Sequence, residues 1–585
     1  MRLLRRLDKF FKKQPDVCKF SLDYLDKIDT PLKENFQKEK FDSSRLLKDK
    51  YTEKLIFSPK HNYIGMIATD KNEKKCLCVY NFNAQQSYEI QNVYNAVWSG
   101  LDEYLVYTKQ KEGLIQPYQV YLHKVGSNEK DLLIFETKDD CFVVDVSITK
   151  NNKFILIHKN TRNSNEICLV DANSPWETPV KLNLSERGEY YIESYKKGDF
   201  QVSRTDFNRW ETIYAENPVD DAELFNGHLM LTVRINAYPR LVHVNMETLE
   251  KIIVQTPDVP SKITSGVNID HEASSYNFTW ESPICPPVEM NYNFITKEVS
   301  NLNDVKEIIN AKIETKSVFN GDVEIPVTII KPLEKSMKGA LLNAYGCYGV
   351  PLNADFKIQN VHLLQNGMSI VLAHIRGGGD KGRSWHQSAV TKNKINSVRD
   401  LEAVSLDLIK ENKICNENTL CGIGVSAGGF TFGALHNLHP FLFRCLILRC
   451  PFLDPHAMLM DEKHSLSTLD YSEFGDPTRN IKDKENLKEL SPLLNIPIVC
   501  RGFKPNAQKD INLLVTASLN DKRVDFKCAE EWVLKKRASL KSLSKSSKVE
   551  TFVHWLWKEN DSHADMSSIS NKALENTFLL DKLNY

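Results

Sequence analysis

The sequence predicts two large parts, an all-β region followed by an α/β domain with a mostly parallel sheet. The length of 585 residues is several times the commonest domain size, so more than one domain is expected. Short runs of alternating apolar and polar residues fill positions 50–305 without a helical segment, which is typical of β-strands. After residue 306, apolar strands alternate with helical stretches, which indicates βαβ units.

The composition excludes several classes of protein. The 76 Lys and Arg residues balance 76 Asp and Glu residues, which argues against bulk attraction to nucleic acid or to an anionic membrane. Apolar residues make up 41% of the chain, enough to bury large cores, and they form no run long enough for a transmembrane helix. The 13 cysteines include no C-x-x-C pair, so we expect reduced thiols and no zinc or thioredoxin-like site. We expect neither a metal nor an organic cofactor.

Residues 1–13 have the pattern of a basic amphipathic helix, with the apolar side chains from Leu3 to Phe11 on one face. Such a start fits a mitochondrial presequence, a membrane-surface helix or a helix docked on the fold. Asp8 and the lack of serines favour docking. Because the features of a secretory signal are missing as well, we expect a cytosolic protein, with the mitochondrion as the minor alternative.

The all-β region contains regularly spaced strands, for example at 63–69, 75–82, 104–109 and 153–159. This pattern fits a β-propeller or a large sandwich, and the recurring order of strands and turns favours the propeller. In the α/β region, the strands at 339–345 and 419–424 and the helices at 397–412 and 427–438 predict a sheet with helices on both faces. Open sheets of this kind place their chemistry at the carboxyl ends of the strands.

Ser426 is the expected nucleophile. It lies in Gly424-Val425-Ser426-Ala427-Gly428, a G-x-S-x-G string between an apolar strand and a helix. A serine on that sharp turn is exposed at the start of the helix, so the context favours a nucleophile over an ordinary glycine-rich turn.

A serine nucleophile needs a base, and the base needs an acid that orients it. Asp521 follows the strand 511–517, where the acid is expected, although a turn or N-cap aspartate would also fit there. His563 lies in the polar loop after the strand 550–557 and is the expected base. His554 competes with it, but it lies inside that strand and is expected to pack.

The oxyanion of an acyl-transfer reaction needs two donors. Ala427 offers its N–H at the start of a helix, and the second donor is expected from Tyr345 or Tyr348 in the loop after the strand at 339. The alternative for that loop is a glycine-rich turn with core aromatics.

These motifs, together with AYGCYG, HIRGGGDKGRSWH, TKNKIN and N-D-K-R-V, resemble the prolyl oligopeptidase family of serine hydrolases. The resemblance extends from about residue 50 to the end and is closest to its oligopeptidase B and prolyl endopeptidase-like branch. It implies an amino-terminal segment (1–50) that packs on the hydrolase domain, a seven-bladed β-propeller (51–305) and an α/β-hydrolase domain (306–585), with the active site between the last two.

The resemblance also implies roles for single residues. Ser426 matches the nucleophile, Asp521 the acid and His563 the base, and Tyr345 matches the tyrosine that assists the N–H of Ala427 in the oxyanion hole. Two further matches concern substrate binding. Arg523 matches an arginine that binds a carbonyl of the substrate backbone, and Glu473 retains one position of an acidic cluster whose neighbour is here Ser472.

Two functions follow from the resemblance. The first is a serine-type endopeptidase that cleaves short peptides, because the propeller excludes folded proteins. The second is a prolyl endopeptidase-like esterase or thioesterase, or a protein-binding regulator of vesicle trafficking with weak or no peptidase activity. An inactive hydrolase that retains its triad is a further alternative.

Overall fold

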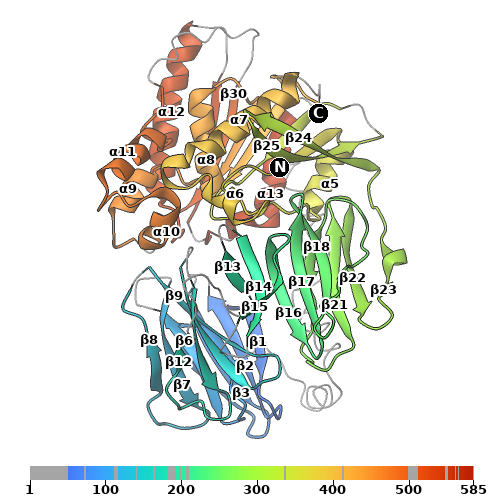
Figure 1. Cartoon of the computed structure of the whole chain (residues 1–585). Coiled ribbons are helices and arrows are strands. Elements are labelled where there is room, and N and C mark those ends of the chain that lie inside the picture. The colour runs from blue at the N-terminus through green and yellow to red at the C-terminus, as the bar shows by residue number, and fades with distance from the viewer. Residues whose placement is uncertain are drawn as a thin grey trace.

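The computed structural model describes residues 50–583 except for short stretches within them: 71–73, 111–115, 140, 162–164, 182–192, 197–198, 206–209, 335–336, 411–413, 465, 498–510, 547–550, 560 and 564. The segment 1–50 expected to pack on the hydrolase domain therefore lies, apart from Lys50, outside the described residues. The two predicted parts are both present, with the α/β domain above a group of small antiparallel sheets in Figure 1.

The described part of the all-β region forms five four-stranded sheets and one three-stranded sheet. The first two sheets contain β1 (Lys50–Phe57), β2 (Tyr63–Asp70), β3 (Lys75–Asn81) and β4 (Gln86–Gln91), then β5 (Val93–Trp98), β6 (Tyr104–Gln110), β7 (Pro117–Lys124) and β8 (Leu132–Glu136). The third contains β9 (Val143–Ile148), β10 (Phe154–Asn160), β11 (Asn165–Asp171) and β12 (Val180–Lys181), and the three-stranded sheet contains β13 (Glu193–Lys196), β14 (Asp199–Thr205) and β15 (Trp210–Tyr214). The last two contain β16 (Val219–Phe225), β17 (His228–Ile235), β18 (Tyr238–Asn245) and β19 (Lys251–Ile253), then β20 (Lys262–Ser265), β21 (Ser275–Ser282), β22 (Cys285–Asn293) and β23 (Val299–Ser300).

The propeller is confirmed, but the expected seven blades are wrong: the described residues hold five four-stranded blades. The blades share apolar cores with their neighbours in the chain. Leu77 of β3 and Leu105 of β6 belong to one core, and Val106 of β6 packs with Ile155 of β10 in the next. Since adjacent residues of a strand face opposite sides, Leu105 and Val106 join their blade to both neighbours.

The α/β domain is built on an eight-stranded sheet in the order β24-β25-β27-β26-β28-β29-β30-β31. The pairs β24/β25 and β25/β27 are antiparallel and the remaining pairs are parallel, which confirms the predicted mostly parallel sheet. Its strands are β24 (Ala311–Asn320), β25 (Val323–Pro332), β26 (Gly339–Asn343), β27 (Met368–Ala373), β28 (Leu420–Val425), β29 (Cys445–Arg449), β30 (Ile511–Ser518) and β31 (Thr551–Lys558).

Helices cover both faces of this sheet, as predicted. Leu341 and Ile447 face one core together with residues of α5 (Ile358–Gln365) and α13 (Ile569–Lys582). Leu342 and Leu448 face the other core with α7 (Ile395–Lys410), α8 (Ala427–Leu438) and α12 (Phe526–Ser546). The smaller helices are η1 (Leu302–Asp304), α6 (Arg383–Gln387), η2 (Thr391–Asn393), α9 (Pro455–Met460), α10 (Ser467–Phe474), α11 (Ile481–Leu490) and η3 (Asp565–Ser567). None of the helices in the described ranges is both long and apolar enough to cross a membrane.

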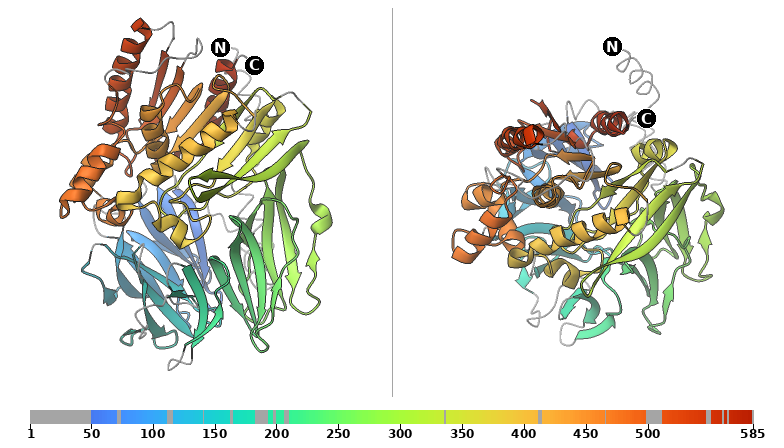
Figure 2. Two further views of the ribbon diagram at one scale, coloured as in Figure 1. Left: turned by 45° about the horizontal axis from the view of Figure 1, so that its top comes forward. Right: turned by 90° about the horizontal axis from the view of Figure 1, so that it is seen from above.

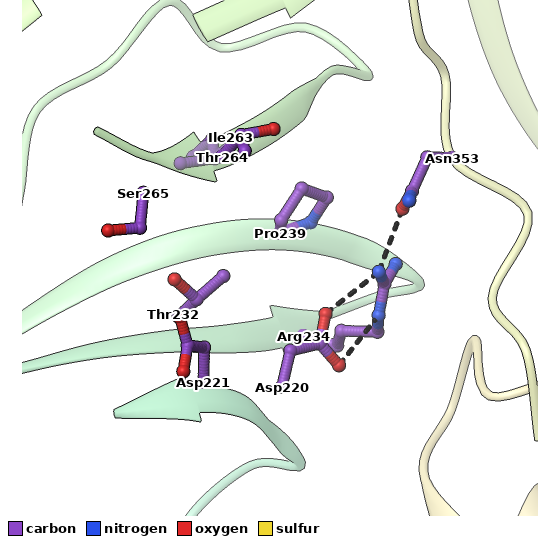
Figure 3. A pocket seen from close by; sticks show the side chains of 9 residues that line it. All are labelled: Asp220, Asp221, Thr232, Arg234, Pro239, Ile263, Thr264, Ser265 and Asn353. Atoms are coloured by element: carbon purple, nitrogen blue, oxygen red, sulfur yellow. Dashed lines mark hydrogen bonds and ion pairs between the residues drawn. The ribbon is translucent and has the colours of Figure 1, made fainter. Parts of the chain in front are cut away.

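Polar contacts join the propeller to the α/β domain. The guanidinium of Arg234 in β17 pairs with Asp220 at 2.8 Å and donates to Asn353 of the α/β domain at 2.7 Å, and these residues line a cavity of about 240 Å³ (Figure 3). The hydroxyl groups of Tyr238 and Thr328 share a hydrogen bond of 2.8 Å. The blade β16–β19 consequently lies directly against the α/β domain, and the turned view at the left of Figure 2 shows the propeller beside that domain.

Candidate active site

Ser426 lies on the sharp turn between β28, which ends at Val425, and α8, which begins at Ala427. Its φ of 53° and ψ of −122° are a strained combination for a residue with a side chain. The turn is held from β29 because the N–H of Ser426 donates to the carbonyl of Arg449 at 2.9 Å. A Cβ at Gly424 would lie 2.8 Å from the carbonyl oxygen of Gly428, so the backbone can pass this closely only where the residue is glycine.

The structure brings Asp521 and His563 together. Oδ2 of Asp521 lies 2.6 Å from Nδ1 of His563, while Oδ1 accepts the backbone N–H groups of Arg523 at 2.9 Å and Val524 at 3.0 Å. The carboxylate is almost fully buried and the imidazole is 12% exposed. With Nδ1 bound to the carboxylate, Nε2 is the nitrogen left to accept a proton.

His554, the competing candidate, lies elsewhere. It pairs with Leu514 inside the sheet, and its ring packs against Phe578 of α13 with centroids 5.5 Å apart. Partial burial lowers the pKa of His554, although its side chain is still exposed to solvent on β31. The side chain of Arg523 is exposed on the loop that carries Asp521.

Cys450 is a neighbour of this pair that the sequence analysis did not single out. Its sulfur and the side-chain ligand atoms of Asp521 and His563 all lie within 4.8 Å of one another. Burial and the Asp521 carboxylate raise the pKa of the Cys450 thiol, so the thiol stays protonated beside the acid. The signal was its position directly after β29, at the same edge of the sheet as Ser426 and Asp521.

The two oxyanion candidates have different surroundings. Tyr345 lies beside the first turn of α8, where a Cβ at Gly428 would be 3.2 Å from the Tyr345 ring. The hydroxyl of Tyr348 donates to Asp470 at 3.0 Å instead. Ala427 is the first residue of α8, so its N–H is one of those in the first turn that have no acceptor within the helix.

Glu473 does not lie where a substrate would reach it. Its side chain is fully buried, with Oε1 bound to Lys394 Nζ at 2.6 Å and to the N–H of Tyr348 at 2.9 Å, and with Oε2 at 2.6 Å from His386 Nε2. Both carboxylate oxygens are thus occupied by protein donors. This placement argues against the substrate-binding role that the resemblance implies for Glu473.

Comparison with known proteins agrees with both parts of the fold. The model described as prolyl oligopeptidase family matches residues 354–580, and that of its N-terminal beta-propeller domain matches residues 55–305. The chain is 25% identical over 530 residues to the Gallus gallus protein named prolyl endopeptidase-like, covering 85% of this chain and 70% of that protein. It is 26% identical over 481 residues to protease 2 of Moraxella lacunata, covering 77% and 67% of the two chains.

Solved structures show the same fold. Oligopeptidase B from Leishmania major superimposes with a TM-score of 0.80 at 17% identity, covering 93% of this chain and 81% of that chain. The two family models together span most of the chain, the propeller model over the small antiparallel sheets and the other over the α/β domain. The chain therefore belongs to the prolyl oligopeptidase family and is a serine hydrolase.

Proposed function

We propose that this protein is a peptidase that cleaves short peptides through an acyl-enzyme on Ser426, with His563 as base and Asp521 as acid. The observation that carries the proposal is the 2.6 Å contact between Asp521 and His563. This contact occurs at the edge of the sheet where the strained Ser426 also lies. The backbone N–H of Ser426 donates to the backbone carbonyl of Arg449 at the end of β29.

The mechanism follows from these positions. Oγ of Ser426 attacks the carbonyl carbon of the substrate as Nε2 of His563 takes its proton, and Asp521 stabilises the imidazolium. The N–H of Ala427 and the hydroxyl of Tyr345 receive the oxyanion. His563 then returns the proton to the leaving amine, and water, activated by the same imidazole, hydrolyses the ester on Ser426.

Two features favour a peptide as the substrate. The side chain of Arg523, two residues after the acid, is exposed, and we propose that it binds a backbone carbonyl of the substrate. A propeller packed against the hydrolase domain would admit only small substrates to the active site. The similarity to a protein named protease 2 agrees with this choice. We also propose that the protein acts in the cytosol.

A second candidate is hydrolysis of an ester or thioester, with a protein-binding role in vesicle trafficking. It is favoured by the similarity to a protein named prolyl endopeptidase-like and by the burial of Glu473, which removes the expected acidic contact for a basic substrate.

The test compares fluorogenic peptides, with proline or arginine before the cleaved bond, and an aryl ester. We expect the wild type to turn over at least one peptide and Ser426→Ala to turn over none. Ester hydrolysis without peptide hydrolysis would overturn the peptidase proposal and favour the second candidate.

A further inference from the structure

A buried ion pair lies against the oxyanion loop, by which we mean residues 344–349. Lys394, just before α7, and Glu473, in α10, contact each other at 2.6 Å, and neither side chain is exposed to solvent. His386 of α6 completes the group through Oε2 of Glu473. We call Lys394, Glu473 and His386 the Lys394 network.

The Lys394 network binds the backbone of the oxyanion loop at two points. The carbonyl of Gly346 accepts Lys394 Nζ at 2.9 Å and the hydroxyl of Ser397 at 3.0 Å. The N–H of Tyr348 donates to Glu473 at 2.9 Å. The bound segment begins directly after Tyr345, so the network fixes the backbone that carries the expected oxyanion donor.

The conformation of the loop requires such support. Gly346 and Tyr348 have φ values of 69° and 61°, and the second is a region that residues with side chains rarely adopt. Strained backbone of this kind persists only where the surroundings determine it. The charge-assisted hydrogen bonds of Lys394 to Gly346 and of Tyr348 to Glu473 hold the loop in this conformation.

Both members of the pair are charged at neutral pH. Burial raises the pKa of Glu473, but Lys394 and His386 lower it by more and bring it to about 2. Burial lowers the pKa of Lys394, and its partners Cys347 and Glu473 raise it by more. A buried ion pair of this kind contributes little net stability, because dehydration offsets the attraction. The Lys394–Glu473 pair nevertheless makes directed hydrogen bonds to the oxyanion loop, which a pair of apolar side chains could not make.

We propose that Lys394, Glu473 and His386 are positioning residues that hold Tyr345 in place for the oxyanion, and that Glu473 does not select the substrate. The proposal rests on the acyl-transfer chemistry proposed above. It does not depend on whether the substrate is a peptide or an ester, because both pass through an oxyanion.

The first test measures kcat and KM for Lys394→Met, Glu473→Gln and the milder His386→Gln. Two peptides that differ only in arginine or a neutral residue before the cleaved bond are compared, with the aryl ester beside them. We expect kcat to fall by about tenfold to a hundredfold for every substrate, with KM nearly unchanged. Lys316→Met is the matched control, since Lys316 pairs with Asp407 at 2.6 Å outside this loop, and it should retain full activity.

A loss confined to the arginine peptide would overturn the proposal, because it would make Glu473 a specificity residue. So would an unchanged kcat in all three variants. If only the ester is hydrolysed by the wild type, the peptidase proposal fails while the network is tested on the ester alone.

The second test separates positioning from general stability. Each network variant is combined with Tyr345→Phe in a double-mutant cycle, and folding is monitored by circular dichroism and thermal unfolding. We expect the network variants to lose much less kcat in the Tyr345→Phe background, since they act through that hydroxyl. Full, multiplicative losses in folded double variants would contradict the proposal, and His386→Gln, whose side chain is partly exposed, keeps the test available if the buried variants do not fold.

Discussion

At the scale of single residues, His563 and His554 show how position decides chemistry. His554 lies in β31 and His563 in the loop that follows it. Nδ1 of His563 contacts Asp521, whereas the ring of His554 packs against Phe578. We expect His563→Ala to lower kcat on the order of 10⁴-fold, because the proton of Ser426 then has no acceptor. His554→Ala is the matched control and should retain most of the activity. Equal losses in the two variants would contradict the assignment of the base.

Arg523 offers a second test at this scale. Its backbone N–H holds Asp521 in every variant, so removal of the side chain alone probes substrate binding. We expect Arg523→Ala to raise KM for peptides by about tenfold to a hundredfold and to leave KM for a small aryl ester unchanged. Lys522→Ala, its exposed neighbour, is the control. The same change in KM for both substrates would argue against binding of a peptide backbone.

At the scale of elements, the carboxylate of Glu473 joins α10 to the oxyanion loop, and its pKa is lowered in the folded protein. The pKa of Glu473 falls from 4.5 to about 2 in the folded protein, chiefly because the opposing charges of Lys394 and His386 outweigh its burial. A lowered folded-state pKa stabilises the protein above the unfolded pKa, and that stability is lost as the pH falls through the folded value. We expect the wild type to lose its advantage over Glu473→Gln between about pH 4.5 and pH 2. Urea unfolding of both proteins across that range measures it, and a constant difference would contradict the charged state of Glu473.

The elements also show what sequence patterns could predict. Ser426, Asp521 and His563 each follow a strand of the parallel sheet, so the rule that such strands end at one edge predicted a common location for them, and the structure brings Asp521 and His563 into contact. The contacts of Glu473 with Lys394 and Tyr348 join segments far apart in the chain, and no local periodicity carries that information. The number of blades could not be predicted from the residues, because the repeats are too divergent in sequence to be counted, and the resemblance alone implied seven.

At the scale of the whole molecule, the junction between the propeller and the α/β domain depends on buried polar contacts. Arg234 is 3% exposed and holds both Asp220 and Asn353, as Figure 3 shows. We expect Arg234→Met to lower the free energy of unfolding by about 1–3 kcal/mol, because the hydrogen bonds of its guanidinium to Asp220 and Asn353 are lost. Arg240→Met is the control, since its partner Asp258 is 96% exposed and such surface pairs contribute about 0–1 kcal/mol. Denaturant unfolding compares them, and equal effects would show that the junction does not depend on Arg234.

The proposed function of the whole molecule depends most on an activated Ser426, and labelling with a fluorophosphonate probe tests this activation directly. We predict that the folded wild type is labelled and that Ser426→Ala and His563→Ala are not, whereas His554→Ala is labelled like the wild type. A folded wild type that fails to react, or a Ser426→Ala variant that still reacts, would contradict the assignment of nucleophile and base.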